Sequence, residues 1–458
     1  MRSRKAEIVR RVHALPLVAY DDARRLTSFS GLVLFFALFR AIGLLARLRG
    51  CFAHLGRGRV FGTARVVLQL VVHVVLGFRR LRDRDCYADD PLVCRMLGVT
   101  RLPDVATISR TLADADGRSV VNLRGLVRQL VLDRLASAGL ARVTIDFDGS
   151  VLSTSRRAEG SAVGYNPKRK GARSYYPLFA VVSQLGMFFD MLHRAGNVHD
   201  SNGSTGFIRE CVQALRARLP RAVLEARLDS AFFDQRVLAL LEELRVEYAA
   251  AVPFAAHVPL RHLVDSRERW RRIDDEWSYF ETRWRPKSWS SKRRIVLVRR
   301  RHRSRRKGPV QLDLFEPDSF EFEYKAIVTN KTVTAATVIA FFNGRGLQEQ
   351  VFGEAKQHAN LDYVPCKRLV PNQLYVLATM LAHNLGRELQ LRAEPERRAT
   401  TPTRAAVFAL RTLGTIRDQL VRRAGALSRP QGRLALTVAA PALARAEFDD
   451  LLEHLQAV

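Results

Sequence analysis

The segment 342–356 contains the side chains whose types and spacing most strongly suggest chemistry. At about 100° per residue, one face of a helix over this segment gathers aromatic and charged residues within an arc of about 80°: Phe342, Arg345, Glu349, Phe352 and Lys356. An ordinary amphipathic helix places only apolar residues on one stripe. A carboxylate between two cations indicates a site for a metal ion and a phosphate group, whereas a solvated face with intrahelical ion pairs is the alternative interpretation.

Two aspartates upstream favour the metal interpretation. Residues 141–150 alternate like a β-strand and end in a turn-forming Asp-Gly pair that contains Asp148. Residues 223–230 are rich in apolar side chains and predict a second strand, which ends at Asp229. Neighbouring strands that end at one edge of a sheet can bring distant carboxylates together, and these aspartates with Glu349 would offer the hard oxygen ligands that suit Mg²⁺. Two such ions can clamp the attacking and leaving oxygens of an in-line phosphoryl displacement.

The charge of the chain is strongly one-sided. Its 458 residues include 75 Lys and Arg against 45 Asp and Glu, a formal net charge of +30. This excess indicates a polyanionic partner, and nucleic acid is favoured over membrane because no lipidation signal or long basic amphipathic helix is evident. Five scattered cysteines without a CxxC pair argue against a zinc site and fit a reducing cytoplasm. The apolar runs 29–39 and 66–78 are shorter than the ~18 residues of a membrane-spanning helix and are expected to be core helices.

The order of the expected elements predicts an α/β fold. Residues 1–135 are expected to be mostly helical, including helices over 32–48 and 64–81. From residue 141 the expected order is strand, hairpin, helix, strand, helix, strand, which is typical of a ribonuclease-H-like mixed-sheet core. A single helix from about residue 335 would contain the charged stripe and complete this core. The expected strands cover 141–147, 175–182, 186–193, 222–228 and 246–253.

A basic, tryptophan-rich segment interrupts the expected core. Residues 255–330 hold all four tryptophans and the densest basic run, 299–307, and predict a small β-rich insertion with a basic loop. Farther along, 371–391 predicts a strongly apolar helix. The expected division is a helical DNA-binding region, the first part of the core, the β-rich insertion, the completion of the core and a C-terminal tail: 1–135, 136–254, 255–332, 333–391 and 392–458.

A second basic cluster follows the first acidic motif. Lys168, Arg169, Lys170 and Arg173 interleave with the tyrosines of 165–176. Because the charge is one-signed and lies close to the expected metal site, the cluster is predicted to grip DNA phosphates; a solvated turn is the alternative.

With these motifs in order, the sequence resembles the DDE transposases of bacterial insertion sequences, in the subgroup whose nuclease core carries a β-rich insertion. The signature of that family is Tyr, two residues, Arg, three residues, Glu, six residues and Lys. The stretches around Asp148 and Asp229 are similar to its two acidic motifs. Four residues match the spacing of the signature, with Phe in place of Tyr: Phe342, Arg345, Glu349 and Lys356.

The resemblance implies Mg²⁺-dependent cleavage at the ends of a mobile element, which releases 3′-hydroxyls that attack target DNA. It implies that Asp148, Asp229 and Glu349 hold two Mg²⁺ ions, for which Mn²⁺ could substitute. Arg345 and Lys356 would hold phosphates beside the scissile bond. The implied partners are double-stranded element ends and target DNA, paired by a homodimer at the nucleoid in the bacterial cytoplasm, with no membrane partner.

Several alternatives stay open. The chain could be a catalytically inert DNA-binding regulator derived from a transposase, or a ribonuclease-H-like nuclease that joins no strands. Asp146 is an alternative ligand to Asp148, since alternation puts both on one face of the strand, and the similarity to the acidic motif favours Asp148. Asp234 and Glu354 are expected to be surface carboxylates. His383 lacks a spaced partner ligand and is expected to be structural.

Two further motifs suggest contacts with partners. Trp289, which has Lys and Arg nearby in the sequence, could stack on an unpaired base, while a core tryptophan of a small β module is the alternative. The residues Gln311-Leu312-Asp313-Leu314-Phe315 resemble the pentapeptide by which bacterial replication and repair proteins dock on the sliding clamp, while an edge strand is the alternative.

Overall fold

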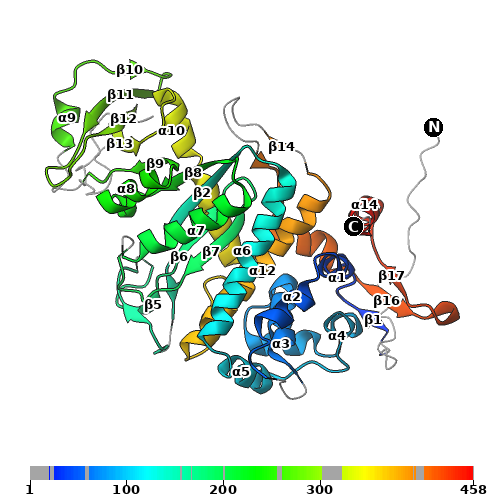
Figure 1. Cartoon of the computed structure of the whole chain (residues 1–458). Helices are drawn as coiled ribbons and strands as arrows, with labels where there is room; N and C mark the ends of the chain where they lie inside the picture. Colours follow the sequence, from blue (N-terminus) through cyan, green and yellow to red (C-terminus); the bar gives the residue numbers. More distant parts are fainter. Residues whose placement is uncertain are drawn as a thin grey trace, which may run out of the picture.

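A nine-stranded mixed sheet lies at the centre of the computed structural model, with helices on both faces (Figure 1). Within the described residues, no helix is long and apolar enough to cross a membrane. The structure describes residues 20, 25–56, 61–154, 157–166, 168–199, 202–254, 260–301, 322–395, 397–398 and 407–456.

Five strands form the half of the sheet that contains the acidic motifs. Their spatial order is β7-β6-β2-β8-β9. β6 runs antiparallel to β2 and β7, whereas β8 runs parallel to β2 and β9. All five expected strands are present, although most are shorter than their predicted ranges: β2 (Arg142–Gly149), β6 (Leu178–Val182), β7 (Met187–Leu192), β8 (Val223–Leu228) and β9 (Glu247–Ala251).

Side-chain alternation along these strands builds a core on each face of the sheet. On one face, Phe147 packs at 6.1 Å between ring centroids against Phe207 of α7 (Ser204–Arg218), and α8 (Gln235–Glu243) belongs to the same core. On the other face, Phe352 of α11 (Gly346–His358) packs edge-on against Phe179 and Phe188, at 5.4 and 5.6 Å. These aromatic contacts fix α11 on the sheet.

Four strands extend the same sheet beyond β9, and every neighbouring pair among them is antiparallel. β13 meets β9 over three residue pairs, from Ala249 to Ala251, whereas β12 pairs with β11 and with β13 over eight. The expected β-rich segment therefore joins the core through a short stretch of a shared sheet (Figure 1). Its strands are β10 (Arg271–Arg272), β11 (Trp277–Trp284), β12 (Arg293–Arg301) and β13 (Phe322–Thr329).

The N-terminal part is helical, as predicted, but the helix expected over 32–48 is broken. Gly43 adopts a left-handed conformation with φ of +62°, which glycine tolerates without a Cβ penalty, and so separates two shorter helices. The two expected core helices are confirmed, since twelve of the fourteen residues of α3 are buried and α1 is half buried. The helices are α1 (Leu32–Ala41), α2 (Leu44–Cys51), α3 (Thr63–Leu76), α4 (Pro91–Leu97), α5 (Val105–Ala113) and α6 (Gly117–Ala138).

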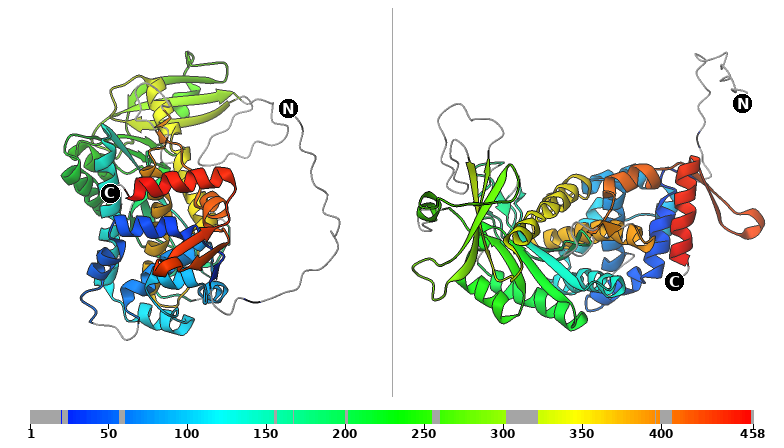
Figure 2. Two further views of the ribbon diagram at one scale, coloured as in Figure 1. Left: turned by 90° about the vertical axis from the view of Figure 1, so that its right-hand side faces the viewer. Right: turned by 90° about the horizontal axis from the view of Figure 1, so that it is seen from above.

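The last part of the chain returns to the N-terminal helices. The apolar helix expected over 371–391 is α12 (Leu369–Arg392), and nearly all of its residues are buried. The hairpin of β16 and β17 pairs with β1 and projects at the end of the molecule opposite β10 and β11 (Figure 2). The elements are β1 (Leu26–Thr27), α13 (Leu413–Ile416), β16 (Gly425–Ser428), β17 (Ala435–Val438) and α14 (Ala442–Gln456).

The expectation that Glu354 is a surface carboxylate is wrong. Its side chain on α11 is 6% exposed, forms an ion pair with Arg387 of α12 and accepts the backbone N–H of Leu413 at 2.9 Å. His383 lies 3.6 Å away, and burial lowers the pKa of this histidine to about 4, so it is neutral at pH 7. Glu354 therefore links three helices, and its partners are distant in sequence.

We expect Glu354→Ala to lower the free energy of unfolding by about 3–5 kcal/mol, because Arg387 would stay buried without its counter-charge. The matched control is Glu243→Ala, which removes an exposed partner of Arg209 and should cost less than about 1 kcal/mol. Urea unfolding midpoints of the two variants and the parent measure the difference. Equal midpoints for the two variants would contradict the conclusion that Glu354 is a buried counter-charge of Arg387.

Candidate active site

The two acidic motifs end next to each other on adjacent parallel strands. β2 and β8 pair in register up to Phe147 and Leu228, so Asp148 and Asp229 occupy the next positions along each strand. Arg345 joins them, with its Nη2 3.0 Å from Asp148 Oδ2 and 3.5 Å from Asp229 Oδ2. The structure thus brings together three of the predicted site residues from three distant segments.

Two residues earlier on each strand lies a closed ion pair. Asp146 and Arg227 are register partners, with Nε–Oδ1 and Nη2–Oδ2 distances of 2.6 and 2.7 Å, and Arg227 also donates to Ser183 Oγ at 2.6 Å. Burial raises the pKa of Asp146, and Arg227 opposes that shift. Because Arg227 engages both oxygens of Asp146, Asp148 is the aspartate of β2 that remains near the surface.

The helix expected from residue 335 is in fact two helices, α10 (Ala335–Asn343) and α11. At Gly344 between them, a Cβ would lie 2.2 Å from Arg227 Nη1, and the same nitrogen donates to the carbonyl of Phe341 at 3.2 Å. The prediction of one continuous charged stripe is therefore wrong. Phe342 belongs to α10 and packs in a separate apolar cluster, while Arg345 precedes the first turn of α11.

The acidic pair fits a divalent cation, but the third predicted ligand is not placed with it. Asp148 and Asp229 both contact the guanidinium of Arg345, and 19% and 25% of their side-chain surfaces are exposed. Such carboxylates are the donors that Mg²⁺ prefers. Glu349 is exposed on the first turn of α11. In the described part of the chain, no three His, Cys, Asp or Glu side chains are grouped to hold a metal ion.

A basic cavity of about 400 Å³ begins where β2 ends, with Gly149 and Ser150 in its wall. Burial lowers the pKa of Lys356, and the nearby cation of Lys168 lowers it further. Asp362 is the one carboxylate that lines the cavity among the described residues. We call this site the basic cavity; its charged lining is Arg79, Lys168, Arg169, Lys356 and Asp362.

The remaining predicted DNA contacts have different surroundings. Arg173 donates from Nε to Ser161 Oγ at 3.1 Å, and Lys170 is exposed. Trp289 stacks on Phe233 with ring centroids 4.5 Å apart, and the Arg293 guanidinium lies 5.2 Å from its ring. The clamp-like peptide 311–315 lies outside the described residues.

Sequence reasoning missed Arg227, Arg79 and Asp362. Arg227 could have been found, since it precedes Asp229 by two residues as Asp146 precedes Asp148, and a basic residue opposite an acidic one on adjacent strands forms a pair. Arg79 and Asp362 belong to no motif, and only tertiary structure brings them together.

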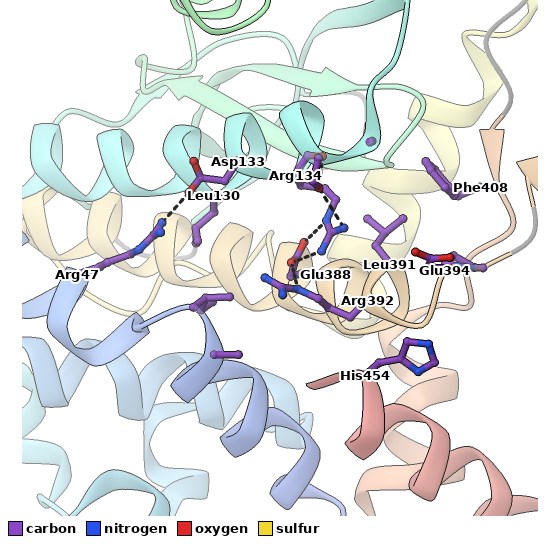
Figure 3. Close-up of a pocket in the computed structure, with 15 residues that line it drawn as sticks. Arg47, Leu130, Asp133, Arg134, Glu388, Leu391, Arg392, Glu394, Phe408 and His454 are labelled. Atoms are coloured by element: carbon purple, nitrogen blue, oxygen red, sulfur yellow. Dashed lines mark hydrogen bonds and ion pairs between the residues drawn. The ribbon is translucent and has the colours of Figure 1, made fainter. Parts of the chain in front are cut away.

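A larger cavity of about 610 Å³ lies between α1, α6, α12 and α14 (Figure 3). Several of its charged groups are paired with one another: Arg134 binds Glu388 at 2.5 and 2.7 Å, and Arg392 binds the same carboxylate at 2.8 Å. None of the predicted site residues lines it. The acidic pair with the basic cavity is therefore the better candidate for chemistry.

The sequence and the fold were compared with known proteins. The family model described as "Transposase DDE domain group 1" matches residues 9–458. No curated protein sequence matches the chain. A structure of the piggyBac transposase synaptic complex with hairpin DNA is 13% identical and covers 78% of this chain and 75% of its own, with a TM-score of 0.36. A Mos1 transposase paired-end complex with the left transposon end is 10% identical and covers 42% and 59%, with a TM-score of 0.18.

We expect Gly344→Ala to destabilise the protein by about 1–3 kcal/mol through overpacking. The added methyl group would meet Arg227 Nη1, which cannot withdraw without breaking its bonds to Asp146 and Ser183. Gly353→Ala is the matched control, because that glycine lies within α11 and a Cβ there meets nothing within 4 Å. The control should gain up to about 1 kcal/mol of helix stability. The measurement is the thermal unfolding midpoint of each variant relative to the parent. If Gly344→Ala and Gly353→Ala shift the midpoint in the same direction, this account of the helix break is wrong.

Proposed function

The chain belongs to the transposase DDE domain group 1 family, and from this premise we propose that it cleaves the ends of a DNA element and joins the 3′-hydroxyls to target DNA by two-metal phosphoryl transfer. One observation carries the proposal: Asp148 and Asp229, at the ends of adjacent parallel strands, both contact the guanidinium of Arg345. As a DNA transposase it would act at the bacterial nucleoid.

We further propose that the five strands β7-β6-β2-β8-β9 form a ribonuclease-H-like core. Their order and the single antiparallel direction of β6 support this assignment. The strands β10 to β13 would then form the insertion, and the division into 1–135, 136–254, 255–332, 333–391 and 392–458 is part of the same proposal.

Asp148 and Asp229 would hold Mg²⁺, with Mn²⁺ as a substitute, and Glu349 would complete the ligand set after Arg345 leaves the two carboxylates. Bound metal ions would supply Lewis-acid stabilisation of the attacking and leaving oxygens. In the structure, the single charge of Arg345 compensates part of the charge of the two aspartates. On DNA, its planar guanidinium would instead bind a phosphate oxygen beside the scissile bond.

The basic residues near the acidic pair would bind the DNA backbone. Lys168, Arg169 and Lys356 line the basic cavity. Lys170 follows on the same loop and Arg173 begins β5 (Arg173–Tyr175), and both would bind phosphates farther from the reacting bond. Trp289 would contact an unpaired base with the exposed part of its ring; Phe233 stacks on this ring, and the Arg293 guanidinium lies over it. A homodimer would pair two element ends.

The exposed position of Glu349 favours a second candidate, a catalytically inert DNA-binding regulator. The two candidates share the family, the charge and the acidic pair. They differ in whether DNA strands are cut when divalent ions are present, so one assay separates them.

We expect Asp148→Asn, Asp229→Asn and Glu349→Gln each to reduce Mg²⁺-dependent strand cleavage more than about a hundredfold, while DNA binding changes less than about threefold. The substrate is linear DNA that contains any short inverted repeats found on either side of the gene. Asp275→Asn is the control, since this carboxylate is 88% exposed on the strand extension, by which we mean β10 to β13 and the turns between them. Cleavage by the Glu349→Gln protein at the parental rate would remove Glu349 from the site. DNA binding by the parent without any cleavage would favour the inert regulator.

We expect Arg345→Ala to bind Mn²⁺ several-fold more tightly than the parent in the absence of DNA. The substitution removes the cation that competes for the two aspartates, and two facing carboxylates then repel each other until a cation arrives. The rise in unfolding temperature with Mn²⁺ concentration measures this affinity. Arg294→Ala is the control, because it removes the same charge from a pair with Glu281 on the strand extension. An unchanged Mn²⁺ response in the Arg345→Ala protein would contradict the role of Arg345 as an internal counter-ion.

A further inference from the structure

We propose that the basic cavity is a subsite for one backbone phosphate of a DNA strand, and that Asp362 occupies it in the DNA-free protein as an internal counter-anion. The inference rests on the proposed function and deepens it, because it adds Arg79 to the DNA-binding residues and assigns Asp362 as the counter-anion that DNA replaces. Both lie outside the acidic motifs and outside the signature of spaced Arg, Glu and Lys residues.

The cavity gathers cations from three separate segments. Arg79 follows α3, Lys168 and Arg169 lie on the loop between β4 (Ala162–Val163) and β5 (Arg173–Tyr175), and Lys356 lies on α11. Lys356 and Lys168 are close enough for their charges to repel, and burial adds to the cost of the Lys356 charge. Like charges held together without an anion are unfavourable, so this arrangement favours a bound anion.

Asp362 supplies negative charge to this group of cations. Its Oδ1 lies 2.9 Å from Arg79 Nη1, and its charge favours the protonated form of Lys356. The Arg79 guanidinium lies over the Tyr363 ring, 5.5 Å from its centre, where the ring face attracts the cation. A phosphate oxygen accepts hydrogen bonds from the same donors as a carboxylate oxygen does. Asp362 is thus a chemical stand-in for the phosphate.

The ion pair between Arg79 and Asp362 can be exchanged. Their side chains are 44% and 38% exposed, so the pair stands in solvent, where such pairs contribute about 1 kcal/mol or less. A phosphate carries its charge on several oxygens and can contact Arg79, Lys356 and Lys168 together, which one carboxylate on a short side chain cannot do. DNA binding would therefore displace Asp362 and recruit Arg79.

The position of the cavity suits a phosphate that neighbours the reacting one. Gly149 and Ser150, which directly follow Asp148, form part of its wall, and the charge of Asp148 also acts on Lys356. A strand whose scissile phosphate lies at the acidic pair would extend naturally into this cavity. The partner is therefore a phosphodiester backbone, and no base recognition is required.

The test compares Asp362→Asn with Arg79→Ala for binding to a fluorescein-labelled oligothymidylate of about twenty nucleotides, in EDTA and over a range of salt concentrations. We expect Asp362→Asn to bind about threefold to tenfold more tightly, because the competing anion is gone. Arg79→Ala should bind more weakly by a similar factor. Its plot of log affinity against log salt should lose about 0.7 of its slope, the value for one phosphate contact on single-stranded DNA.

The exposed pair between Arg209 and Glu243 provides controls, since its shortest contact is 2.8 Å, close to the 2.9 Å of Arg79 and Asp362, and it does not line the cavity. Glu243→Gln and Arg209→Ala make the same changes in net charge and should alter affinity less than about twofold. Binding by Asp362→Asn that is no tighter than binding by Glu243→Gln would overturn the inference. An unchanged salt slope for Arg79→Ala would overturn it as well.

A variant that fails to fold would not block the test. Unfolding temperatures are compared first, and Lys168→Ala, which alters an exposed residue of the same cavity, carries the same expectation as Arg79→Ala. Binding is measured without divalent ions, so its result is independent of the cleavage assay. Cleavage could fail while Asp362→Asn still binds more tightly, and cleavage could succeed while the cavity variants behave like their controls.

Discussion

The buried ion pair between Asp146 and Arg227 is the interaction on which the geometry of the candidate site depends. It joins β2 to β8, and the same guanidinium donates to the carbonyl of Phe341 at the end of α10. Removal of one partner of a buried pair costs about 3–5 kcal/mol, because the other charge is left uncompensated. The two strands and the break between α10 and α11 are therefore fixed together. Arg345 directly follows that break, so its place between the two surface aspartates depends on a contact deeper in the sheet.

Sequence periodicity predicted most of the sheet and the strand ends that contain Asp148 and Asp229. It failed where the structure of one segment depends on contacts with another segment that is distant in sequence. From the sequence, Gly344 could continue a helix. In the structure, the Arg227 guanidinium fills the space that a side chain at position 344 would need. Glu354 has the type and spacing of a surface residue, and only the packing of α12 supplies Arg387 as its buried partner. Helical spacing could place Glu349 one turn after Arg345, but it could not show whether that turn faces the acidic pair.

Opposite charges lie close together at this edge of the sheet, and the chain supplies a counter-ion for each. Arg345 lies between two carboxylates, and Asp362 lies among the cations of the basic cavity. In a chain with a net charge of +30, clustered cations destabilise the folded state by repulsion, and internal counter-ions reduce this repulsion. The two pairs differ in burial: Arg345 and its two aspartates are at most 25% exposed, whereas Arg79 and Asp362 are 44% and 38% exposed, so the second pair is the weaker one. The same internal ions that reduce repulsion within the folded chain therefore also compensate the charged groups of the candidate site.

The strand extension is connected to the acidic edge by more than its sheet. β13 and β9 share only three residue pairs, which alone would leave a narrow junction. Trp289, in the turn between β11 and β12, stacks on Phe233, and Phe233 follows the short 3₁₀ turn that Asp229 caps by accepting the N–H of Ala231 at 3.0 Å. Such an aromatic pair contributes about 0.5–1.5 kcal/mol beyond the apolar area that it buries, so it adds to the junction between the extension and the core. The extension therefore meets the acidic edge at a second point, where one stacked pair contacts the turn that Asp229 caps.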